Sequence, residues 1–373
     1  MRIALDASFL ALPPSGTSSY IRHLSAALRD LEPSLQLQSL EPAWPKDGGD
    51  SMPSRRQRLD WELHGVGTET RRTDPDLLHI PHFSAPLVSV GAPLVITVHD
   101  VIPLVVPAYR ASRSARARLA IMERTIRRAR LRVTPSHHAA SDIHHVLKTP
   151  IARIRVTPLA ADPTIRPMRD SVTPVSTELM RDLGVHGRYV FNIAGFDARK
   201  NLPVLIEAFA RTLPHLHEPV WLVIAGAPHS ANETVFPPLE PVIERHGVRG
   251  NVILTGMVSV AEKTALYQHA SLYVTPSSYE GFGLTALEAM AAGVPTIGAD
   301  RTSLPEVIGE GGLLVEPDAA ALATAMVSVL NDSSIAARLS QAALDQAATF
   351  SWQQTARLTL EAYRDVIAFS SRR

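Results

Sequence analysis

The chain has 373 residues, more than one hydrophobic core usually organises, so its length predicts two domains. A hydrophobic content of 45% with 20% charged residues is typical of a globular protein and excludes disordered and collagen-like chains. The formal net charge of +1 gives no overall field that favours nucleic acid, and the absence of cysteine excludes disulfides, thiolate metal sites and cysteine nucleophiles.

Short aliphatic runs alternate with longer amphipathic stretches in the first half of the chain. This alternation predicts a parallel sheet covered by helices. The expected strands are residues 2–5, 77–80, 94–98, 131–134 and 156–159. Clusters of Pro, Gly, Asp and Arg in residues 41–72 predict a loop followed by a basic helix, and the Pro-, Thr- and Asp-rich residues 160–186 predict a domain linker.

A second alternating series follows the predicted linker. Its expected strands are residues 189–194, 221–225, 252–255, 272–275, 296–298 and 312–315. This series predicts a second doubly wound domain. From residue 333 onward the apolar residues recur close to every 3.6 positions, as at Trp352, Leu360, Tyr363 and Val366, so we expect closing helices.

The most informative stretch is residues 277–290, which follow an expected strand and open an expected helix. Such a junction presents free backbone N–H groups and the positive end of the helix, which suit a diphosphate. Gly281 and Gly283 allow close backbone approach to a ligand. Glu280 precedes the helix and Glu288 lies about two turns into it. The two carboxylates either bind different parts of one extended ligand, or Glu288 lies on a solvated helix face.

This stretch resembles the E-x7-E motif of the retaining glycosyltransferases of family 4, which have the GT-B fold. Other similar segments occur in the family's order: Ala4-Leu5-Asp6-Ala7 with Ser15-Gly16-Thr17-Ser18-Ser19-Tyr20, Val98-His99-Asp100-Val101-Ile102-Pro103-Leu104, Thr134-Pro135-Ser136, Gly195-Phe196-Asp197-Ala198-Arg199-Lys200-Asn201 and Thr302-Ser303-Leu304-Pro305-Glu306-Val307-Ile308-Gly309. The resemblance covers nearly the whole chain. It implies an α/β protein with two Rossmann-like doubly wound domains facing across a cleft.

The resemblance also implies domain boundaries. The N-terminal, acceptor-side domain is expected at residues 1–165, and the C-terminal, nucleotide-sugar-binding domain at residues 180–354. A C-terminal helix, at about residues 355–373, is expected to cross back to the N-terminal domain.

Two cations follow the first expected strand of the second domain. In the family a lysine at this place stabilises the departing diphosphate, which implies that role for Lys200, with Arg199 beside it. Phe196 stands where many members have an arginine, and Arg199 is the expected replacement for that contact. The alternative is a solvated pair at a helix start, where cations oppose the helix dipole.

The implied catalytic residues are Glu280, Lys200 and His99. Glu280 is expected to orient the donor sugar and Glu288 the ribose. The full set of expected donor-binding residues is Gly16, Arg199, Lys200, Glu280, Gly281, Phe282, Gly283, Leu284, Thr285 and Glu288.

The expected N-terminal domain contributes a glycine and three histidines. Gly16 either ends a tight loop that faces the donor or belongs to a plain surface turn, and Ser18-Ser19 replace a second glycine common in the family. His99 follows an expected strand, and the resemblance implies that it bonds a hydroxyl of the donor sugar, although a structural histidine is the alternative. His79 and His82 either line the acceptor cleft or are loop residues.

A metal ion is not expected. Asp74-Pro75-Asp76 has the spacing of a metal-binding Asp-x-Asp, but it precedes the expected strand 77–80 and so belongs to the sheet edge opposite the ligand crevice. We interpret it as a turn and strand start. Lys200, Arg199 and the helix end can stabilise the developing charge instead, and no other cofactor is expected.

Nine arginines lie in residues 110–132, interspersed with apolar residues. This basic amphipathic helix either contacts an anionic membrane surface or an acidic acceptor, or is a solvated face. Charges interrupt the first apolar run, and no uncharged stretch approaches the roughly 20 residues of a membrane span. We therefore expect an unprocessed cytoplasmic protein, with peripheral contact at the inner face of the membrane as an open alternative.

The expected reaction is hexosyl transfer with retention, from a nucleotide sugar to a hydroxyl of a saccharide or lipid-linked saccharide. The segments Val98 to Leu104 and Ser303 to Val307 most resemble the mannosyltransferase-type members of the family, which favours GDP-mannose as donor. UDP-, dTDP- and other GDP-hexoses stay open. Two other classes are possible: a GT-B epimerase or phosphorylase, and a non-catalytic donor-binding subunit. No nucleic acid partner is expected.

Overall fold

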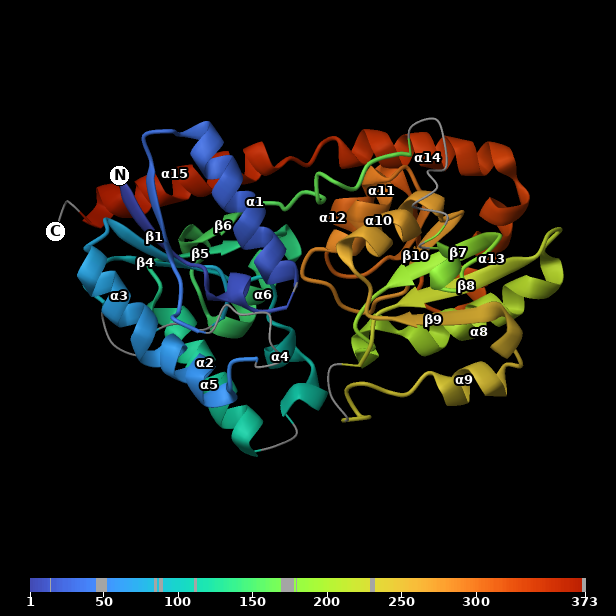
Figure 1. The fold of residues 1–373 in the computed structure, drawn as a ribbon, viewed down its shortest axis with the longest axis horizontal. Helices are drawn as coiled ribbons and strands as arrows, with labels where there is room; N and C mark the ends of the chain where they lie inside the picture. Colours follow the sequence, from blue (N-terminus) through green and yellow to red (C-terminus); the bar gives the residue numbers. More distant parts are fainter. Residues whose placement is uncertain are drawn as a thin grey trace. The chain divides into compact units, whose positions relative to one another are not determined.

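The computed structural model describes residues 1–13, 15–44, 52–83, 86, 90–110, 113–168, 178, 180–228 and 232–370 (Figure 1). The chain forms two compact units. The N-terminal unit comprises Met1–Leu159 and Ser351–Arg373, and the C-terminal unit comprises Ala160–Phe350. The chain therefore leaves the N-terminal unit once and returns to it for its last helix.

The N-terminal unit is built on a six-stranded parallel sheet in the order β2-β1-β3-β4-β5-β6. Its strands are β1 (Arg2–Asp6), β2 (Gln36–Leu40), β3 (Leu77–Ile80), β4 (Leu94–Thr97), β5 (Leu131–Thr134) and β6 (Ile154–Val156). The sequence predicts all of these except β2, although it places β6 too far along the chain. β2 escapes prediction because it is an edge strand with polar residues and partial exposure, whereas the central β3 is buried throughout.

The helices of the N-terminal unit pack on both faces of this sheet (Figure 1). They are η1 (Ser8–Ala11), α1 (Gly16–Leu31), α2 (Arg55–Asp60), the π-helix η2 (Trp61–Gly65), α3 (Val66–Thr73), α4 (Ile102–Val105), η3 (Pro107–Arg110), α5 (Arg113–Arg128), α6 (His137–Leu147), η4 (Ile151–Arg153) and α15 (Trp352–Ser370). The basic helix predicted within residues 41–72 is confirmed by α2, which continues directly into η2 and α3.

The last helix, α15, belongs to the N-terminal unit and packs beside α1 (Figure 1). Trp352 at its start stacks on His23 of α1, with ring centroids 5.1 Å apart. Tyr363 lies farther along α15, and its hydroxyl is 2.6 Å from His79 Nδ1. These contacts give the predicted return of the C-terminal helix a physical basis, since its apolar face completes the core of the N-terminal unit.

The C-terminal unit has a second six-stranded parallel sheet, in the order β12-β11-β10-β7-β8-β9. Its strands are β7 (Arg188–Ile193), β8 (Val220–Ala225), β9 (Val252–Gly256), β10 (Leu272–Thr275), β11 (Thr296–Ala299) and β12 (Leu313–Val315). Its helices are η5 (Ala198–Lys200), α8 (Leu202–Thr212), η6 (Leu213–His215), α9 (Glu240–Arg245), η7 (Arg249–Asn251), α10 (Val260–His269), α11 (Leu284–Ala291), α12 (Leu304–Ile308), η8 (Gly309–Gly311), α13 (Ala319–Asn331) and α14 (Ser333–Ala347). The six strands predicted for this domain are confirmed.

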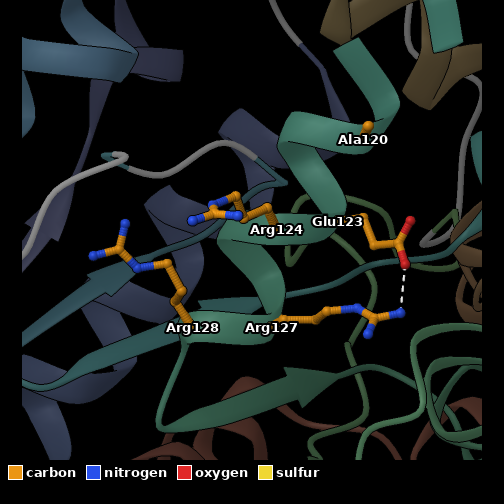
Figure 2. Close-up of a pocket in the computed structure, with 5 residues that line it drawn as sticks. All are labelled: Ala120, Glu123, Arg124, Arg127 and Arg128. Carbon is orange, nitrogen blue, oxygen red and sulfur yellow. Dashed lines mark hydrogen bonds and ion pairs between the residues drawn. The ribbon is translucent and has the colours of Figure 1, made fainter. Parts of the chain in front are cut away.

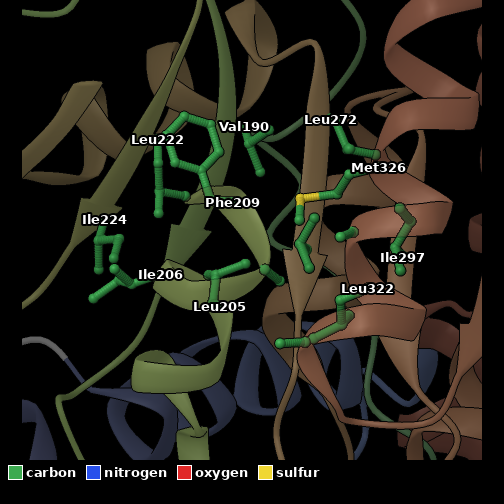
Figure 3. Packing of buried hydrophobic residues seen from close by; sticks show 14 of the residues in the cluster. Val190, Leu205, Ile206, Phe209, Leu222, Ile224, Leu272, Ile297, Leu322 and Met326 are labelled. Carbon is green, nitrogen blue, oxygen red and sulfur yellow. The ribbon is translucent and has the colours of Figure 1, made fainter. Parts of the chain in front are cut away.

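The core of the C-terminal unit lies on both faces of its sheet. On one face, Phe209 of α8 and Met326 of α13 pack against Leu222 and other aliphatic side chains of the central strands (Figure 3). On the other face, the cluster includes Ile165, Met180 and Val185. These three residues come from the predicted linker, so its described part contributes to the core of the C-terminal unit.

The predicted basic helix at residues 110–132 is shorter than expected. α5 ends at Arg128, and Arg132 lies in β5, only 2% exposed, where it donates to the carbonyl of Ile126. A cation at this place neutralises the negative end of α5. Along α5 a hollow of about 520 Å³ is lined by Ala120, Glu123, Arg124, Arg127 and Arg128 (Figure 2).

Within the described ranges, no single helix is long and apolar enough to cross a membrane. One sharply bent pair, α13 with the helices from Ser333 to Ser370, passes by length and composition only. The apolar residues of α13 are buried in the core of the C-terminal unit, which accounts for their composition.

Candidate functional site

The candidate site lies where the strand order of the C-terminal sheet reverses. The chain runs outward from β7 through β8 to β9, then returns to β10 on the other side of β7. Open α/β sheets bind ligands beyond the carboxyl ends of the strands at such a switch point. Here the segment after β7 carries Arg199 and Lys200, and the segment after β10 carries Glu280.

The loop after β7 is fixed by its own hydrogen bonds. The Asp197 carboxylate accepts from the backbone N–H of Arg199 at 3.0 Å and so caps the short helix η5. Asn201 then adopts a left-handed conformation with φ of 57°. Its side-chain amide donates to the carbonyls of Pro276 and Pro317, at 3.3 and 3.2 Å. The loops after β7 and β10 are therefore tied to each other by hydrogen bonds.

Glu280 joins the two cations at the centre of the site. Its Oε1 lies 2.5 Å from Lys200 Nζ, and its Oε2 accepts from Arg199 Nη1 at 3.0 Å. The Lys200, Arg199 and Glu280 side chains are 12%, 18% and 9% exposed, so the alternative of a solvated cation pair is wrong. Burial alone would raise the pKa of Glu280, but the charges of Lys200 and Arg199 outweigh it and lower that pKa to about 2.

The backbone of Glu280 is held by the loop between β11 and α12. Its N–H donates to Thr302 Oγ1 at 2.9 Å, and its carbonyl accepts from Ser303 Oγ at 2.9 Å. Thr302 has a φ of 52°, which is rare for a β-branched residue. Backbone strain of this kind concentrates at functional sites, where the surroundings enforce it. Thr302 and Ser303 belong to a segment that carries the family resemblance, but the sequence alone did not assign them this role.

The helix after the E-x7-E loop starts as predicted. Gly283 precedes α11 with a φ of 100°, and a Cβ at this position would lie 2.8 Å from a methyl carbon of Leu304. Leu284 and Thr285 form the half-exposed first turn, whereas Gly281 and Phe282 are buried. The Phe282 ring packs against Phe350 with centroids 5.8 Å apart. Phe282 could therefore meet a donor through its backbone only.

Glu288 is buried and paired, and the alternative of a solvated helix face is wrong. It is 4% exposed; Oε1 lies 2.8 Å from Lys263 Nζ and Oε2 lies 3.1 Å from the Tyr267 hydroxyl. Burial raises the pKa of Glu288 despite the opposing charge of Lys263. The two glutamates of the motif thus lie in different ionic environments, one with a lowered and one with a raised pKa.

Sequence reasoning missed Lys263 and Tyr267. Both lie on α10, one helical turn apart, which lets them reach the same carboxylate. A compositional signal was present, because only four of the 37 basic residues are lysines. Two of these four, Lys200 and Lys263, pair with the two glutamates of the motif.

Gly16 is the first residue of α1 in the N-terminal unit. A Cβ at Gly16 would meet nothing within 4 Å, so neither packing nor φ requires glycine there. Ser15 caps the helix, and the Ser18 hydroxyl accepts from the Ser15 N–H at 2.8 Å. Ser18 therefore closes a capping box where the family often has a second glycine.

His99 follows β4, as predicted. Its Nε2 lies 3.2 Å from the carbonyl oxygen of Pro81, and its ring meets Tyr20 edge to face at 5.0 Å. Burial lowers the pKa of His99 to about 4, so the ring is neutral at pH 7. A neutral ring with one nitrogen donating keeps the other as an acceptor, which suits a sugar hydroxyl.

His79 fits neither predicted alternative, whereas His82 is a loop residue, as one alternative predicted. His79 is fully buried in β3, with one ring nitrogen 2.6 Å from the Tyr363 hydroxyl and the other 2.7 Å from Thr97 Oγ1. It is a structural residue of the core. His82 follows β3 and lies 2.8 Å from a carboxylate oxygen of the buried Asp6.

Asp74 and Asp76 form a turn and a strand start, as predicted. Asp74 ends α3 in a left-handed conformation, and Asp76 Oδ2 accepts from the backbone N–H of Arg2 at 2.7 Å. Across the part of the chain that the structure describes, no three His, Asp or Glu side chains gather in a way that could hold a metal ion.

Comparison with known proteins identifies related sequences over most of the chain. The family profile described as Glycosyltransferase Family 4 matches residues 14–164, and the profile described as Glycosyl transferases group 1 matches residues 180–346. The O-antigen chain mannosyltransferase B of Escherichia coli is 30% identical over 271 residues, which cover 72% of this chain and 70% of that protein.

Solved structures agree on the fold. Sucrose-phosphate synthase from Thermosynechococcus elongatus superposes with a TM-score of 0.75 at 20% identity, covering 99% of both chains. The Anabaena protein HepE in complex with UDP and glucose gives a TM-score of 0.71 at 18% identity, over 97% of this chain and 98% of that one. These likenesses, with the two parallel sheets, confirm the GT-B type of α/β fold.

Proposed function

The chain belongs to glycosyltransferase family 4, and we propose that it transfers a hexose from a nucleoside-diphosphate sugar to a hydroxyl of a saccharide or lipid-linked saccharide. One observation carries this proposal: the buried Glu280 is paired with the half-buried Lys200 and Arg199 at the switch point of the C-terminal sheet. GDP-mannose is the first proposed donor, supported by the similarity to the mannosyltransferase of E. coli.

The proposed chemistry needs positive charge at the leaving group. As the bond between the anomeric carbon and the diphosphate breaks, negative charge grows on the phosphate oxygens. Lys200, Arg199 and the amino end of α11 can stabilise this charge in a water-poor site, which supports transfer without a metal ion. Fixed charges of this kind cost no reorganisation during the reaction.

We propose that the reaction retains the anomeric configuration. The acceptor oxygen would form its bond on the face that the diphosphate leaves, and the acceptor proton would pass to a leaving phosphate oxygen. Glu280 would orient the hydroxyls of the donor sugar, and Glu288 the ribose. From the N-terminal unit, His99 would accept from a sugar hydroxyl, and Gly16 would bring backbone close to the donor.

The α5 hollow bears on the class of acceptor. Glu123 pairs with Arg127 at 2.5 Å, while Arg124 and Arg128 extend away from this pair (Figure 2). An anionic lipid-linked acceptor or a membrane surface would find two further cations there, although a solvated face stays the alternative. Binding to vesicles with and without anionic lipid separates these uses. A cytoplasmic location is part of this proposal.

Other donors and other reactions give distinct outcomes. HepE was solved with UDP and glucose, which makes UDP-glucose the second donor to test. An epimerase or phosphorylase would change or release the sugar without an acceptor. A non-catalytic subunit would bind nucleotide sugar and turn nothing over, but Glu280 and Glu288 are both present and buried, and each is paired with a half-buried lysine.

The proposal is tested by measuring the binding of a panel of GDP-, UDP-, ADP- and dTDP-hexoses. Thermal shift and saturation-transfer NMR report this binding. We expect one nucleotide to be preferred, with binding weakened in Glu288→Ala. Arg211→Ala is the matched control, because it removes an exposed ion pair with Glu207 elsewhere in the C-terminal unit. If the wild-type protein binds no member of the panel, the transferase proposal is wrong.

A further inference from the structure

The N-terminal unit holds a buried carboxylate at its own switch point. Its strand order reverses between β1 and β3, and Asp6 is the last residue of β1. Asp6 is 1% exposed. Its Oδ1 accepts from the Ser8 N–H at 3.0 Å and from Trp61 Nε1 at 3.1 Å, and its Oδ2 lies 2.8 Å from His82 Nε2.

This arrangement is a poor source of stability. A buried charge loses its hydration, and apolar replacements of buried ion pairs are often as stable or more stable. Burial alone would raise the pKa of Asp6, yet the hydrogen bond and charge of His82 leave that pKa below its usual value. The carboxylate is therefore ionised at pH 7. A fully satisfied buried network is better suited to fixing one geometry than to adding stability.

The backbone around Trp61 is adapted to this contact. Trp61 opens the π-helix η2 between α2 and α3, and π-helical turns are rare and frequently lie at functional sites. Gly65, at the other end of η2, leaves room for the indole: a Cβ there would lie 2.6 Å from Trp61 Cε3. The wide turn and the glycine together place the Trp61 N–H on Asp6.

The network ends at His99. Because a carboxylate only accepts, His82 donates its Nε2–H to Asp6, which fixes the turn that follows β3. The peptide before His82 carries the Pro81 carbonyl, which lies 3.2 Å from His99 Nε2. A carbonyl also only accepts, so the hydrogen of His99 is on Nε2. The lone pair of the neutral ring is then on Nδ1.

We infer that Gly65, Trp61, Asp6 and His82 form a positioning relay that sets the orientation and tautomer of His99. This inference rests on the proposed role of His99 as acceptor for a hydroxyl of the donor sugar. None of the four relay residues needs to touch the substrate. They act by holding the Pro81 carbonyl where it receives the His99 N–H.

Asp6→Asn is the most informative variant, because it keeps the shape of the side chain. Three donors surround the two oxygens of Asp6, so an amide group either sets one N–H against another or makes His82 move its hydrogen to Nδ1, and both disturb the contact with His82. We expect the His99 tautomer with its hydrogen on Nε2 to become less populated. Turnover should fall by about tenfold, which corresponds to the loss of one well-placed hydrogen bond. Donor affinity should change less than about twofold.

Two further variants test the relay from its far end. Trp61→Phe removes the N–H and keeps an aromatic ring, and Gly65→Ala pushes the indole away from Asp6. Both variants should lower turnover, as Asp6→Asn does. His145→Gln is the control, since His145 lies on α6 and bonds the Ser141 carbonyl of its own helix.

Two measurements carry the test. The first is ¹⁵N NMR of labelled histidine at pH 7, with the His99 signals assigned by His99→Gln, which reports the tautomer without any ligand. The second is GDP release from saturating GDP-mannose, with water and with octyl α-mannoside as acceptor probes. GDP-mannose affinity is measured alongside by calorimetry.

A shifted His99 tautomer together with reduced turnover and unchanged donor affinity supports the relay. The inference is overturned if Asp6→Asn leaves the His99 signals unchanged, or if turnover and donor affinity fall together as in a general loss of structure. A wild-type protein that binds no nucleotide sugar overturns the proposed function instead, and the NMR result still decides whether the relay exists.

Discussion

Lys200 Nζ lies 2.5 Å from Glu280 Oε1, although the two residues are 80 positions apart in the sequence. The contact joins the loops that follow β7 and β10, the two strands at the switch point. Glu280 is therefore paired with the same cation, Lys200, that we propose as a partner of the diphosphate. A bound diphosphate would share these cations with Glu280, so we expect the affinity for nucleotide to depend on the charge of Glu280.

Glu280→Gln should separate nucleotide binding from turnover. Removing the carboxylate leaves Lys200 and Arg199 for the diphosphate, so we expect GDP to bind about tenfold more tightly. Transfer should fall by about a hundredfold, because the group that orients the sugar is weakened. Calorimetry with GDP and a GDP-release assay measure the two effects.

Glu207→Gln is the control for this variant, because Glu207 pairs with Arg211 at 2.6 Å on the exposed face of α8. It should change neither quantity. Weaker GDP binding by Glu280→Gln would show that the carboxylate supports the nucleotide site instead of competing with it.

The lowered pKa of Glu280 predicts a specific loss of stability in acid. Its pKa is about 2 in the folded protein against an ordinary value of 4.5, so the stabilisation is present above pH 4.5 and is lost as the pH falls toward 2. Between pH 5 and pH 3 the wild type should lose about 2 kcal/mol more unfolding free energy than Glu280→Gln. Urea unfolding at both pH values measures the difference, and parallel losses in the two proteins would contradict the assigned pKa.

The elements and the motif were predictable because they depend on local pattern. Strand β10, the glycine turn and helix α11 follow from residues that are neighbours in the sequence. The partners of the two glutamates were not predictable in this way. Lys263 lies 25 residues before Glu288 on another helix, and Thr302 reaches Glu280 from the next loop along the sheet. Such contacts depend on the strand order, which hydrophobic periodicity does not report.

Histidines mark the same limit in the N-terminal unit. His79 lies in β3 and His82 in the bend directly after it, yet His79 bonds Tyr363 in the core and His82 bonds Asp6. The first contact depends on the return of α15, and the second on the pairing of β1 with β3. Neither partner could be chosen from spacing alone.

Gly16→Ala should separate folding from function at the start of α1. A Cβ at Gly16 has open space around it, so we expect unfolding free energy to stay the same or rise by up to about 1 kcal/mol. If Gly16 brings backbone close to the donor, turnover should fall by about tenfold. Thermal unfolding and GDP release provide the two readings. Unchanged turnover would remove Gly16 from the proposed donor contacts.

Gly283→Ala, unlike Gly16→Ala, should lower the unfolding free energy of the protein. The new Cβ would lie 2.8 Å from a Leu304 methyl carbon, at a φ of 100° that side chains rarely adopt. We expect a loss of about 1–3 kcal/mol in unfolding free energy. Gly250→Ala is the matched control, because its Cβ would meet nothing within 4 Å. Equal stability of the two variants would contradict the role of Gly283 in starting α11.

Lys263→Met tests whether the pair with Glu288 is needed in the absence of donor. The variant leaves a buried carboxylate with the Tyr267 hydroxyl as its remaining hydrogen-bond partner among those described, and breaking a buried pair from one side typically costs about 3–5 kcal/mol. Because burial already raises the pKa of Glu288, removal of Lys263 should raise that pKa further and make the loss of unfolding free energy greater at pH 8 than at pH 5.

The double variant Lys263→Met/Glu288→Gln should recover most of the stability, since the amide carries no charge. Urea unfolding of the four proteins in a double-mutant cycle measures the coupling. A single variant as stable as the wild type would mean that Glu288 needs no cation until the ribose arrives.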